Sequence, residues 1–123
     1  MGMKRRPVAQ AEYIVFYDFA AGPSVSSDDN KRMTHADIYV MIGDLTNDED
    51  FLGMVDARGS VLQMIYNAPD DTYSIEIPHP DRQGSSGMTL GFDDLVDLMK
   101  TLPREFSVAA FPGFEFHLWA DEN

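Results

Sequence analysis

Three short apolar segments separated by two turn-forming groups occupy residues 51–77, and this pattern constrains the fold more than any other feature of the chain. The groups are Asp-Ala-Arg-Gly at 56–59 and Asn-Ala-Pro-Asp-Asp at 67–71. Residues of these types end strands and let the chain reverse direction. The pattern therefore predicts an antiparallel meander of three strands, at 51–56, 60–66 and 72–77.

The first of these strands has a competing interpretation. Thr46 and Glu49 fit a helix capping box, in which the threonine hydroxyl bonds a backbone amide and the glutamate reaches back. Against a helix, Gly53 costs roughly 1 kcal/mol relative to alanine in a helix interior. The Asp-Ala-Arg-Gly group also favours a hairpin at this point. We therefore expect a turn at 46–50 before the strand, with a helix as the alternative.

Aromatic and β-branched residues predict strands outside the meander as well. In one of them Ile38, Val40 and Ile42 alternate with other side chains, which is the period of a strand. The segments 20–33 and 78–87 are rich in Gly, Pro, Ser and Asp and are predicted to be loops. The additional predicted strands are 12–19, 36–42 and 114–119.

A change to helical periodicity follows the second loop and predicts one helix at about 91–102. Asp93 and Asp94 stand in its first turn, where the helix dipole favours negative charge, and Pro103 ends it. The apolar stripe that would face the sheet consists of Phe92, Leu95, Val96 and Met99.

These elements together define the expected fold class. At 123 residues the chain is long enough for one core and short for two. We expect an α+β fold in which a twisted, mostly antiparallel sheet of about five to six strands carries one helix on one face. Residues 1–10 are predicted to be a flexible N-terminal arm, and 11–123 a single globular domain.

The charge balance narrows the classes of partner. The chain has 21 acidic and 9 basic residues, which gives a formal net charge of −12. Such a field repels nucleic acids and anionic membranes and attracts a basic partner at long range. No apolar run approaches the roughly 18 residues that span a bilayer, and no cysteine is present for disulfides or thiolate metal sites. We expect a cytoplasmic protein that binds neither nucleic acid nor membrane.

Sequence motifs give no reason to expect catalysis. The histidines, His35, His79 and His117, are far apart and belong to no metal-binding or catalytic motif. The chain has no phosphate-binding loop, no serine elbow and no cysteine nucleophile. We therefore expect no catalytic residues, no metal and no cofactor. An enzymatic activity stays open but is less favoured.

Acidic residues collect in the predicted turns and at the start of the predicted helix, where side chains are exposed. Carboxylates clustered in this way can form a patch for a cationic protein and accelerate its association. The predicted partner-binding residues are Asp48, Glu49, Asp50, Asp70, Asp71, Asp93 and Asp94.

The order of features from Phe51 to Leu102 resembles that of small immunity proteins of bacterial polymorphic toxin systems and related bacterial domains. The resemblance covers less than half of the chain and is carried by the turns, by the helix with acids at its front, and by Leu62-Gln63, Tyr73 and Glu76. The chain departs from the pattern at 67–69, where such families have a tryptophan-rich or glycine-doublet turn. The resemblance implies a non-enzymatic protein that binds a toxin through its acidic loops.

Two other interpretations remain open from the sequence. The first is a small-ligand-binding or enzymatic domain with a pocket between sheet and helix, lined by Tyr39, Tyr66, Tyr73, His117 and Trp119. The second is a homo-oligomeric structural module, assembled through an exposed strand edge or an aromatic patch.

Overall fold

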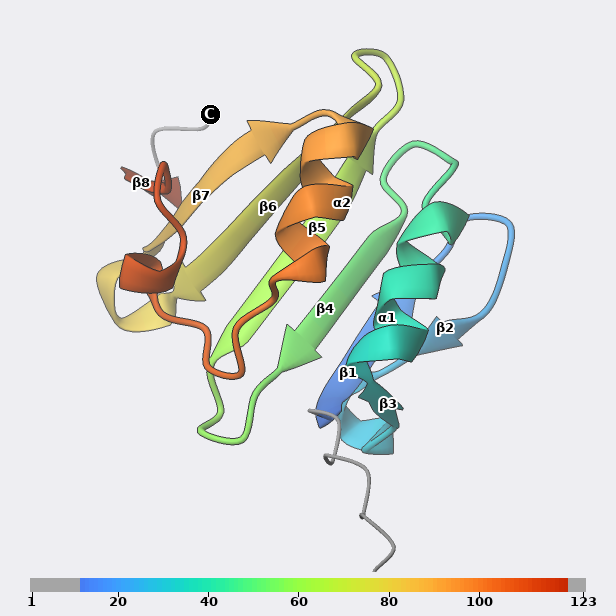
Figure 1. Ribbon diagram of the computed structural model, residues 1–123, viewed down its shortest axis with the longest axis horizontal. Helices are drawn as coiled ribbons and strands as arrows, with labels where there is room; N and C mark the ends of the chain where they lie inside the picture. Colours follow the sequence, from blue (N-terminus) through green and yellow to red (C-terminus); the bar gives the residue numbers. More distant parts are fainter. Residues whose placement is uncertain (1–11, 120–123) are drawn as a thin grey trace, which may run out of the picture.

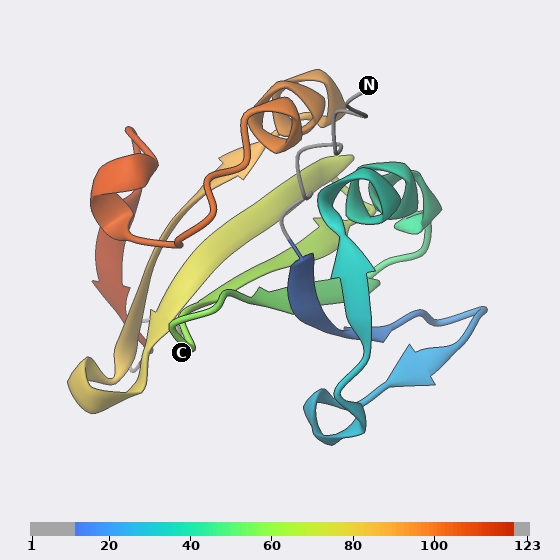
Figure 2. The same ribbon diagram turned by 60° about the horizontal axis from the view of Figure 1, so that its bottom comes forward.

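A single antiparallel sheet organises the structure, a computed structural model that describes residues 12–119. The strand order is β2-β1-β4-β5-β6-β7-β8, with β3 also paired to β1. Both α-helices lie on the same side of this sheet (Figure 1, Figure 2). The predicted N-terminal arm, 1–10, lies outside the described residues.

Within those residues the sheet has eight strands and is accompanied by two α-helices and four short 3-10 helices. The strands are β1 (Glu12–Asp18), β2 (Ser24–Val25), β3 (Arg32–Thr34), β4 (Phe51–Val55), β5 (Val61–Asn67), β6 (Thr72–His79), β7 (Gly84–Leu90) and β8 (Glu115–Leu118). The α-helices are α1 (His35–Met41) and α2 (Phe92–Lys100). The 3-10 helices are η1 (Ser27–Asp29), η2 (Ile42–Asp44), η3 (Pro80–Arg82) and η4 (Val108–Ala110).

The predicted meander is confirmed as β4, β5 and β6. Gly59 supplies the left-handed backbone, with a φ of 90°, that the turn between β4 and β5 requires. The alternative helix before β4 is absent from the described chain, and the place of Gly53 in a strand has a physical reason. The Phe16 ring from β1 occupies the space that a Cβ at this position would take. A side chain larger than hydrogen at residue 53 would displace that ring.

The predicted helix near 91–102 is confirmed as α2. Its start carries Asp93 and Asp94, and its buried face presents Leu95 and Met99 to the sheet. The helix ends at Lys100, earlier than predicted, because Thr101 leaves the helical conformation ahead of Pro103.

The prediction of a strand at 36–42 is wrong, because this segment forms α1 and the start of η2. The Thr34 side chain accepts a hydrogen bond from the Asp37 amide at 3.2 Å and so caps the helix. Ile38 and Ile42 are four residues apart and both are buried, whereas Val40 is 74% exposed. The alternation of Ile38, Val40 and Ile42 is therefore compatible with a helix. Ile38 and Ile42 share its buried face, and Val40 faces solvent.

The prediction of loops at 20–33 and 78–87 is also wrong in part. The first segment contains β2, η1 and the start of β3, and the second contains the end of β6, η3 and the start of β7. Position 84 requires a glycine, because a Cβ there would meet the Phe116 ring and the backbone carbonyl of His117. The described sheet therefore has eight strands where about five to six were expected, and a second helix joins the predicted one.

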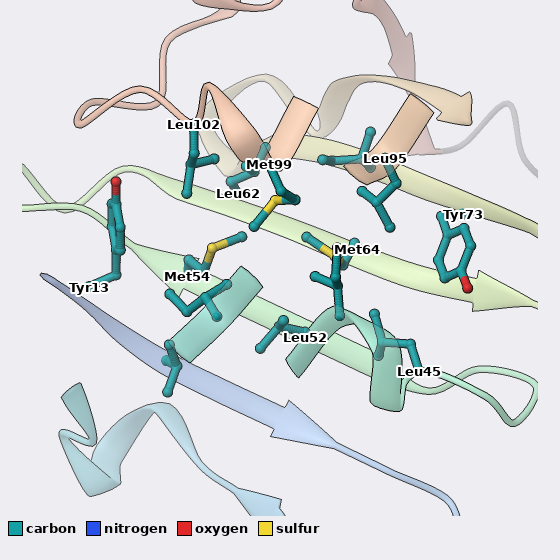
Figure 3. Close-up of a cluster of buried hydrophobic side chains, with 14 of the residues drawn as sticks. Tyr13, Leu45, Leu52, Met54, Leu62, Met64, Tyr73, Leu95, Met99 and Leu102 are labelled. Atoms are coloured by element: carbon teal, nitrogen blue, oxygen red, sulfur yellow. The ribbon is translucent and has the colours of Figure 1, made fainter. Parts of the chain in front are cut away.

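The core lies between the helices and the face of the sheet that they cover. Ile38, Leu95 and Met99 from the helices are fully buried, and Figure 3 shows the last two directed at the strands. The sheet contributes residues that are equally buried: Leu52, Met54, Leu62, Met64 and Ile75. The helix–sheet interface is thus filled by side chains.

Neither α-helix of the described residues lies on the opposite face of the sheet (Figure 2). Side chains alternate between faces along a strand, so the residues next to buried Ile75 and Ile77 point to this open face. On β4 and in the middle of β1 the open face is apolar, and the rings of Phe16 and Phe51 lie 5.5 Å apart, while Glu12 and Asp18 lie at the two ends of β1. On β6, β7 and β8 it is polar, and Glu76 is one of its members.

Candidate functional site

The segments that carry the predicted partner-binding acids meet at one end of the sheet (Figure 1). The turn between β5 and β6 lies beside the loop that precedes β4. Asp48 Oδ1 accepts a hydrogen bond from the Ala68 amide at 3.0 Å, and the Glu49 amide donates to the Tyr66 carbonyl at 2.8 Å. Two acidic groups separated by about twenty residues in the chain are thereby held together.

Aromatic contacts bring the start of α2 to the same end. The rings of Tyr66 and Tyr73 lie 4.9 Å apart, and the ring of Tyr73 lies 6.0 Å from that of Phe92. Phe92 directly precedes Asp93 and Asp94, which are exposed in the first turn of the helix.

We call this surface the acidic end, and it is formed by Asp48, Glu49, Asp70, Asp71, Asp93 and Asp94, all of them exposed. No Lys or Arg occurs in the segments that supply it, 44–50, 67–71 and 91–94. Their carboxylates therefore add to one another, and these three segments together form a negatively charged surface.

Asp50 differs from the other predicted partner-binding residues, because it is only 1% exposed. Its carboxylate accepts three backbone hydrogen bonds, from Ala20 at 2.8 Å, Thr46 at 2.9 Å and Asn47 at 2.8 Å. Burial by itself raises the pKa of Asp50, but these hydrogen bonds outweigh it, and the pKa lies below its ordinary value. Asp50 holds the loop before β4 and is not accessible to a partner.

The hydroxyl of Tyr66 donates a hydrogen bond to Asp71 Oδ1 at 2.8 Å within the acidic end. This bond raises the pKa of Tyr66, with smaller contributions from burial and from the charges of Asp71, Tyr73 and Asp48. We expect the substitution Asp71→Asn to lower the pKa of Tyr66 toward its ordinary value. An NMR titration of the tyrosine ring signals measures this change.

Asp70→Asn is the matched control for that titration, because it removes a neighbouring charge without breaking the hydrogen bond. We expect it to change the pKa of Tyr66 less than Asp71→Asn does. Equal changes in the two variants would mean that the hydrogen bond does not determine the pKa.

The residues of the alternative pocket do not line one cavity. Tyr66 and Tyr73 lie at the acidic end, Tyr39 lies on α1, and His117 and Trp119 lie at or just after β8 at the far edge of the sheet. Buried side chains of the helices and the sheet occupy the interface where these five residues were expected to form a pocket, and ligand binding stays a prediction.

The homo-oligomeric interpretation concerns β8, which ends the strand order and so forms an edge. Phe116 is 38% exposed, Leu118 44% and Trp119 39%. These side chains combine an open edge with apolar surface, which is the combination that such an assembly would use. Self-association stays a prediction.

A feature that the sequence did not predict lies on the open face of the sheet. A groove of about 540 Å³ runs over β6, β7 and β8, and we call it the β6–β8 groove. Its polar lining consists of Ser74, Glu76, Thr89, Glu115 and His117, with Gly87 between the two glutamates. Because 78–87 was predicted to be a loop, no sequence signal placed these residues on adjacent strands.

Among residues 12–119, no group of three or more His, Asp or Glu side chains is arranged to hold a metal ion. No helix in the same range is long and apolar enough to cross a bilayer. Comparison with protein-family models, with curated proteins and with solved structures gave no match for this chain.

Proposed function

We propose that the protein is a non-catalytic binding protein whose acidic end engages a basic protein partner, in the manner of an immunity or inhibitor protein. The observation that carries the proposal is the gathering of three acidic pairs, 48–49, 70–71 and 93–94, on segments without a cation. Exposed charges of one sign steer an oppositely charged protein and can raise association rates by 10-fold to about 1,000-fold.

The contacts of His35 and His79 support a binding role over catalysis. His79 Nε2 lies 3.0 Å from Ser86 Oγ, the spacing of a base and a nucleophile. Ser86 is only 2% exposed, however, and its strand is covered by β8 on one side and β6 on the other. His35 contacts the backbone carbonyl of Met99 at the end of α2. The Ser86 hydroxyl is therefore not presented to a substrate.

The proposal is tested with a triple variant, Asp48→Asn, Asp70→Asn and Asp93→Asn, which removes one charge from each acidic pair. The partner is the basic protein that the wild-type chain retains from its host at low salt. We expect the association rate constant for that protein to fall by about tenfold or more in the variant. We expect a similar fall for the wild type when salt rises from about 0.01 to 0.1 M, where the Debye length shrinks from about 30 to 10 Å. Stopped-flow or surface-based kinetics measure both effects.

The matched control removes three exposed charges elsewhere, at Asp81, Asp97 and Glu105, by Asn or Gln substitution. Its net charge equals that of the test variant, so a difference between the two isolates the acidic end from the overall charge. Equal rates in the two variants, or binding that salt does not weaken, would contradict the proposal.

A further inference from the structure

The β6–β8 groove places two carboxylates on either side of a glycine. Glu76 on β6 pairs with Gly87 on β7, and Gly87 pairs in turn with Glu115 on β8. Residues that are directly opposite in antiparallel strands project to the same face. Because adjacent strands lie about 4.8 Å apart, the backbones of the two glutamates are separated by roughly 10 Å.

The floor of the groove cannot be filled by a side chain at residue 87. A Cβ on Gly87 would meet the carbonyl oxygen of Ile75 and would lie 2.7 Å from the Cβ of Glu76 and 2.9 Å from its Cα. Two of these atoms belong to the backbone of β6 and cannot move aside without breaking the strand pairing. The gap between the carboxylates is therefore a fixed part of the sheet.

Polar contacts within and next to the groove hold its walls. Gln63 on β5 donates a hydrogen bond to Glu76 Oε1 at 2.8 Å, which orients that carboxylate. Beyond His117, the indole Nε1 of Trp119 donates to Ser85 Oγ at 2.8 Å and fixes the ring on the same face. The Glu76 side of the groove is thus ordered before any ligand enters, which lowers the entropy cost of binding.

We propose that the β6–β8 groove binds an arginine side chain of the protein partner, with the guanidinium between Glu76 and Glu115 above Gly87. A guanidinium is planar and has five N–H donors, so it can bond two carboxylates at once. Ser74 and Thr89 pair two residues further along the strands, and their hydroxyl oxygens can accept its remaining donors; Ser74 Oγ also accepts from Asn67 Nδ2 at 3.0 Å. The volume of about 540 Å³ also exceeds what a bare metal ion requires.

This inference adds a specific contact to the proposed function. It rests on the proposed function in one respect, namely that the partner is a basic protein. The acidic end and the groove have separate roles. The acidic end attracts the partner over a distance, and the groove fixes one side chain after contact. Charge complementarity selects an arginine-bearing protein as the occupant over a second copy of this acidic chain.

The first experiment uses N-acetyl-arginine amide as the probe, with N-acetyl-citrulline amide as its neutral isostere, in an NMR titration of the whole protein. We expect saturable shifts of the Gly87 and Thr89 amides with the arginine probe and none with the citrulline probe. Glu76→Gln and Glu115→Gln should each raise the dissociation constant by about tenfold, since each removes a charge-assisted hydrogen bond. The control Glu12→Gln removes the same charge from β1 on the same face and should leave the constant unchanged.

Each outcome of that titration bears on the proposal. Shifts spread over 48–49, 70–71 and 93–94 without saturation at Gly87 would overturn it. So would equal affinities for the two probes, or an effect of Glu12→Gln as large as that of Glu115→Gln. Unchanged amide spectra of the variants outside the groove verify that the sheet stays folded.

A second measurement separates failure of the groove from failure of the proposed function. If Glu76→Gln and Glu115→Gln leave the dissociation rate of the basic partner unchanged while the triple variant of the acidic end slows association, the groove assignment is wrong and the proposed function stands. If no basic protein binds but the arginine probe occupies the groove, the proposed function is wrong and the groove assignment stands.

Discussion

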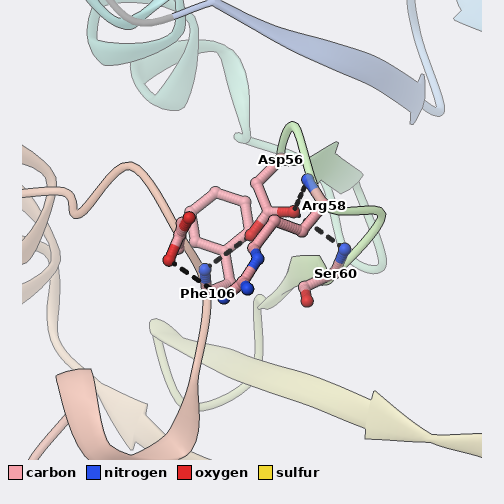
Figure 4. A network of polar contacts seen from close by, with 5 residues as sticks. Asp56, Arg58, Ser60 and Phe106 are labelled. Atoms are coloured by element: carbon pink, nitrogen blue, oxygen red, sulfur yellow. Dashed lines mark hydrogen bonds and ion pairs between the residues drawn. The ribbon is translucent and has the colours of Figure 1, made fainter.

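Replacement of Asp56 by alanine is expected to lower the free energy of unfolding by about 3 kcal/mol, because one carboxylate accepts three backbone hydrogen bonds. Asp56 Oδ1 accepts from the amides of Arg58 at 2.9 Å and Ser60 at 2.8 Å, and Oδ2 accepts from Phe106 at 2.7 Å (Figure 4). Asp56 is only 5% exposed, and its bond to Phe106 is buried. Without the carboxylate the Phe106 amide would stay desolvated and unpaired.

The effect of Asp56→Ala should extend beyond the turn between β4 and β5. The ring of Phe106 stacks on Tyr13 at 5.3 Å, and the Tyr13 hydroxyl donates to the Pro103 carbonyl at 3.1 Å. The segment after α2 is thus fixed to the first strand through the same region. We expect the variant to lose amide-exchange protection at Phe106 before the meander does.

Urea denaturation measures the change in free energy, and Arg58→Ala provides the control in the same turn. Arg58 forms a salt bridge to Glu105 at 3.3 Å, with both side chains more than half exposed. Such exposed pairs contribute about 0 to 1 kcal/mol, so the control should remain close to the wild type. A loss as large in Arg58→Ala as in Asp56→Ala would show that the turn as a whole, and not the buried carboxylate, determines the stability.

The local pattern of the sequence was sufficient to predict the meander and α2. Each is bounded by residues that end strands or helices, and within each the apolar residues repeat with the period of a single type of secondary structure. It was insufficient where two periods fit the same residues. Ile38 and Ile42 satisfy both a strand and a helix, and only the burial of both against the sheet decides between them. It was also misleading for β7, whose glycines are required by neighbouring strands and not by a turn.

The acidic end could be predicted in part from the sequence, whereas the β6–β8 groove could not, because it depends on how the strands pair. The acidic pairs could be placed on turns from the sequence, because polar residues with Pro and Gly are found there. Their position at one end follows from the strand order. Asp50 could not be told from Asp48 by any local signal, since its burial results from three amides that meet its carboxylate. The β6–β8 groove depends on the register of three strands, one of which was predicted to be a loop.

The second large effect is expected at Asp50, and it depends on pH. Burial raises the pKa of this carboxyl group, but hydrogen bonds from Ala20, Asn47 and Thr46 outweigh the burial and lower the pKa below its ordinary value of 3.8. A lowered pKa in the folded state contributes stability above the pKa of the unfolded state, and this contribution is lost as pH falls through the folded value. At pH 7 we expect Asp50→Asn to lower the free energy of unfolding by about 2 kcal/mol, since the charge is lost and the asparagine NH2 group cannot accept the hydrogen bond of the oxygen that it replaces.

Urea denaturation of the wild type and of Asp50→Asn between about pH 7 and pH 3 tests the sign of this contribution. The difference between the two proteins should shrink as the pH falls, because the wild-type carboxylate takes up a proton that the asparagine cannot. Asp70→Asn, an exposed control on the neighbouring turn, should stay within about 0.5 kcal/mol of the wild type throughout. A difference at Asp50 that grows toward acidic pH would contradict the assignment.

The same variant separates the structural role of Asp50 from the partner-binding role that its sequence neighbourhood predicts. Because the side chain is buried, Asp50→Asn should change the association rate of the basic partner less than Asp48→Asn does, although each removes one charge. Both rates are measured at low salt, at a pH where both variants are folded. A larger loss of association in Asp50→Asn, with stability unchanged, would place Asp50 on the binding surface and overturn the structural role.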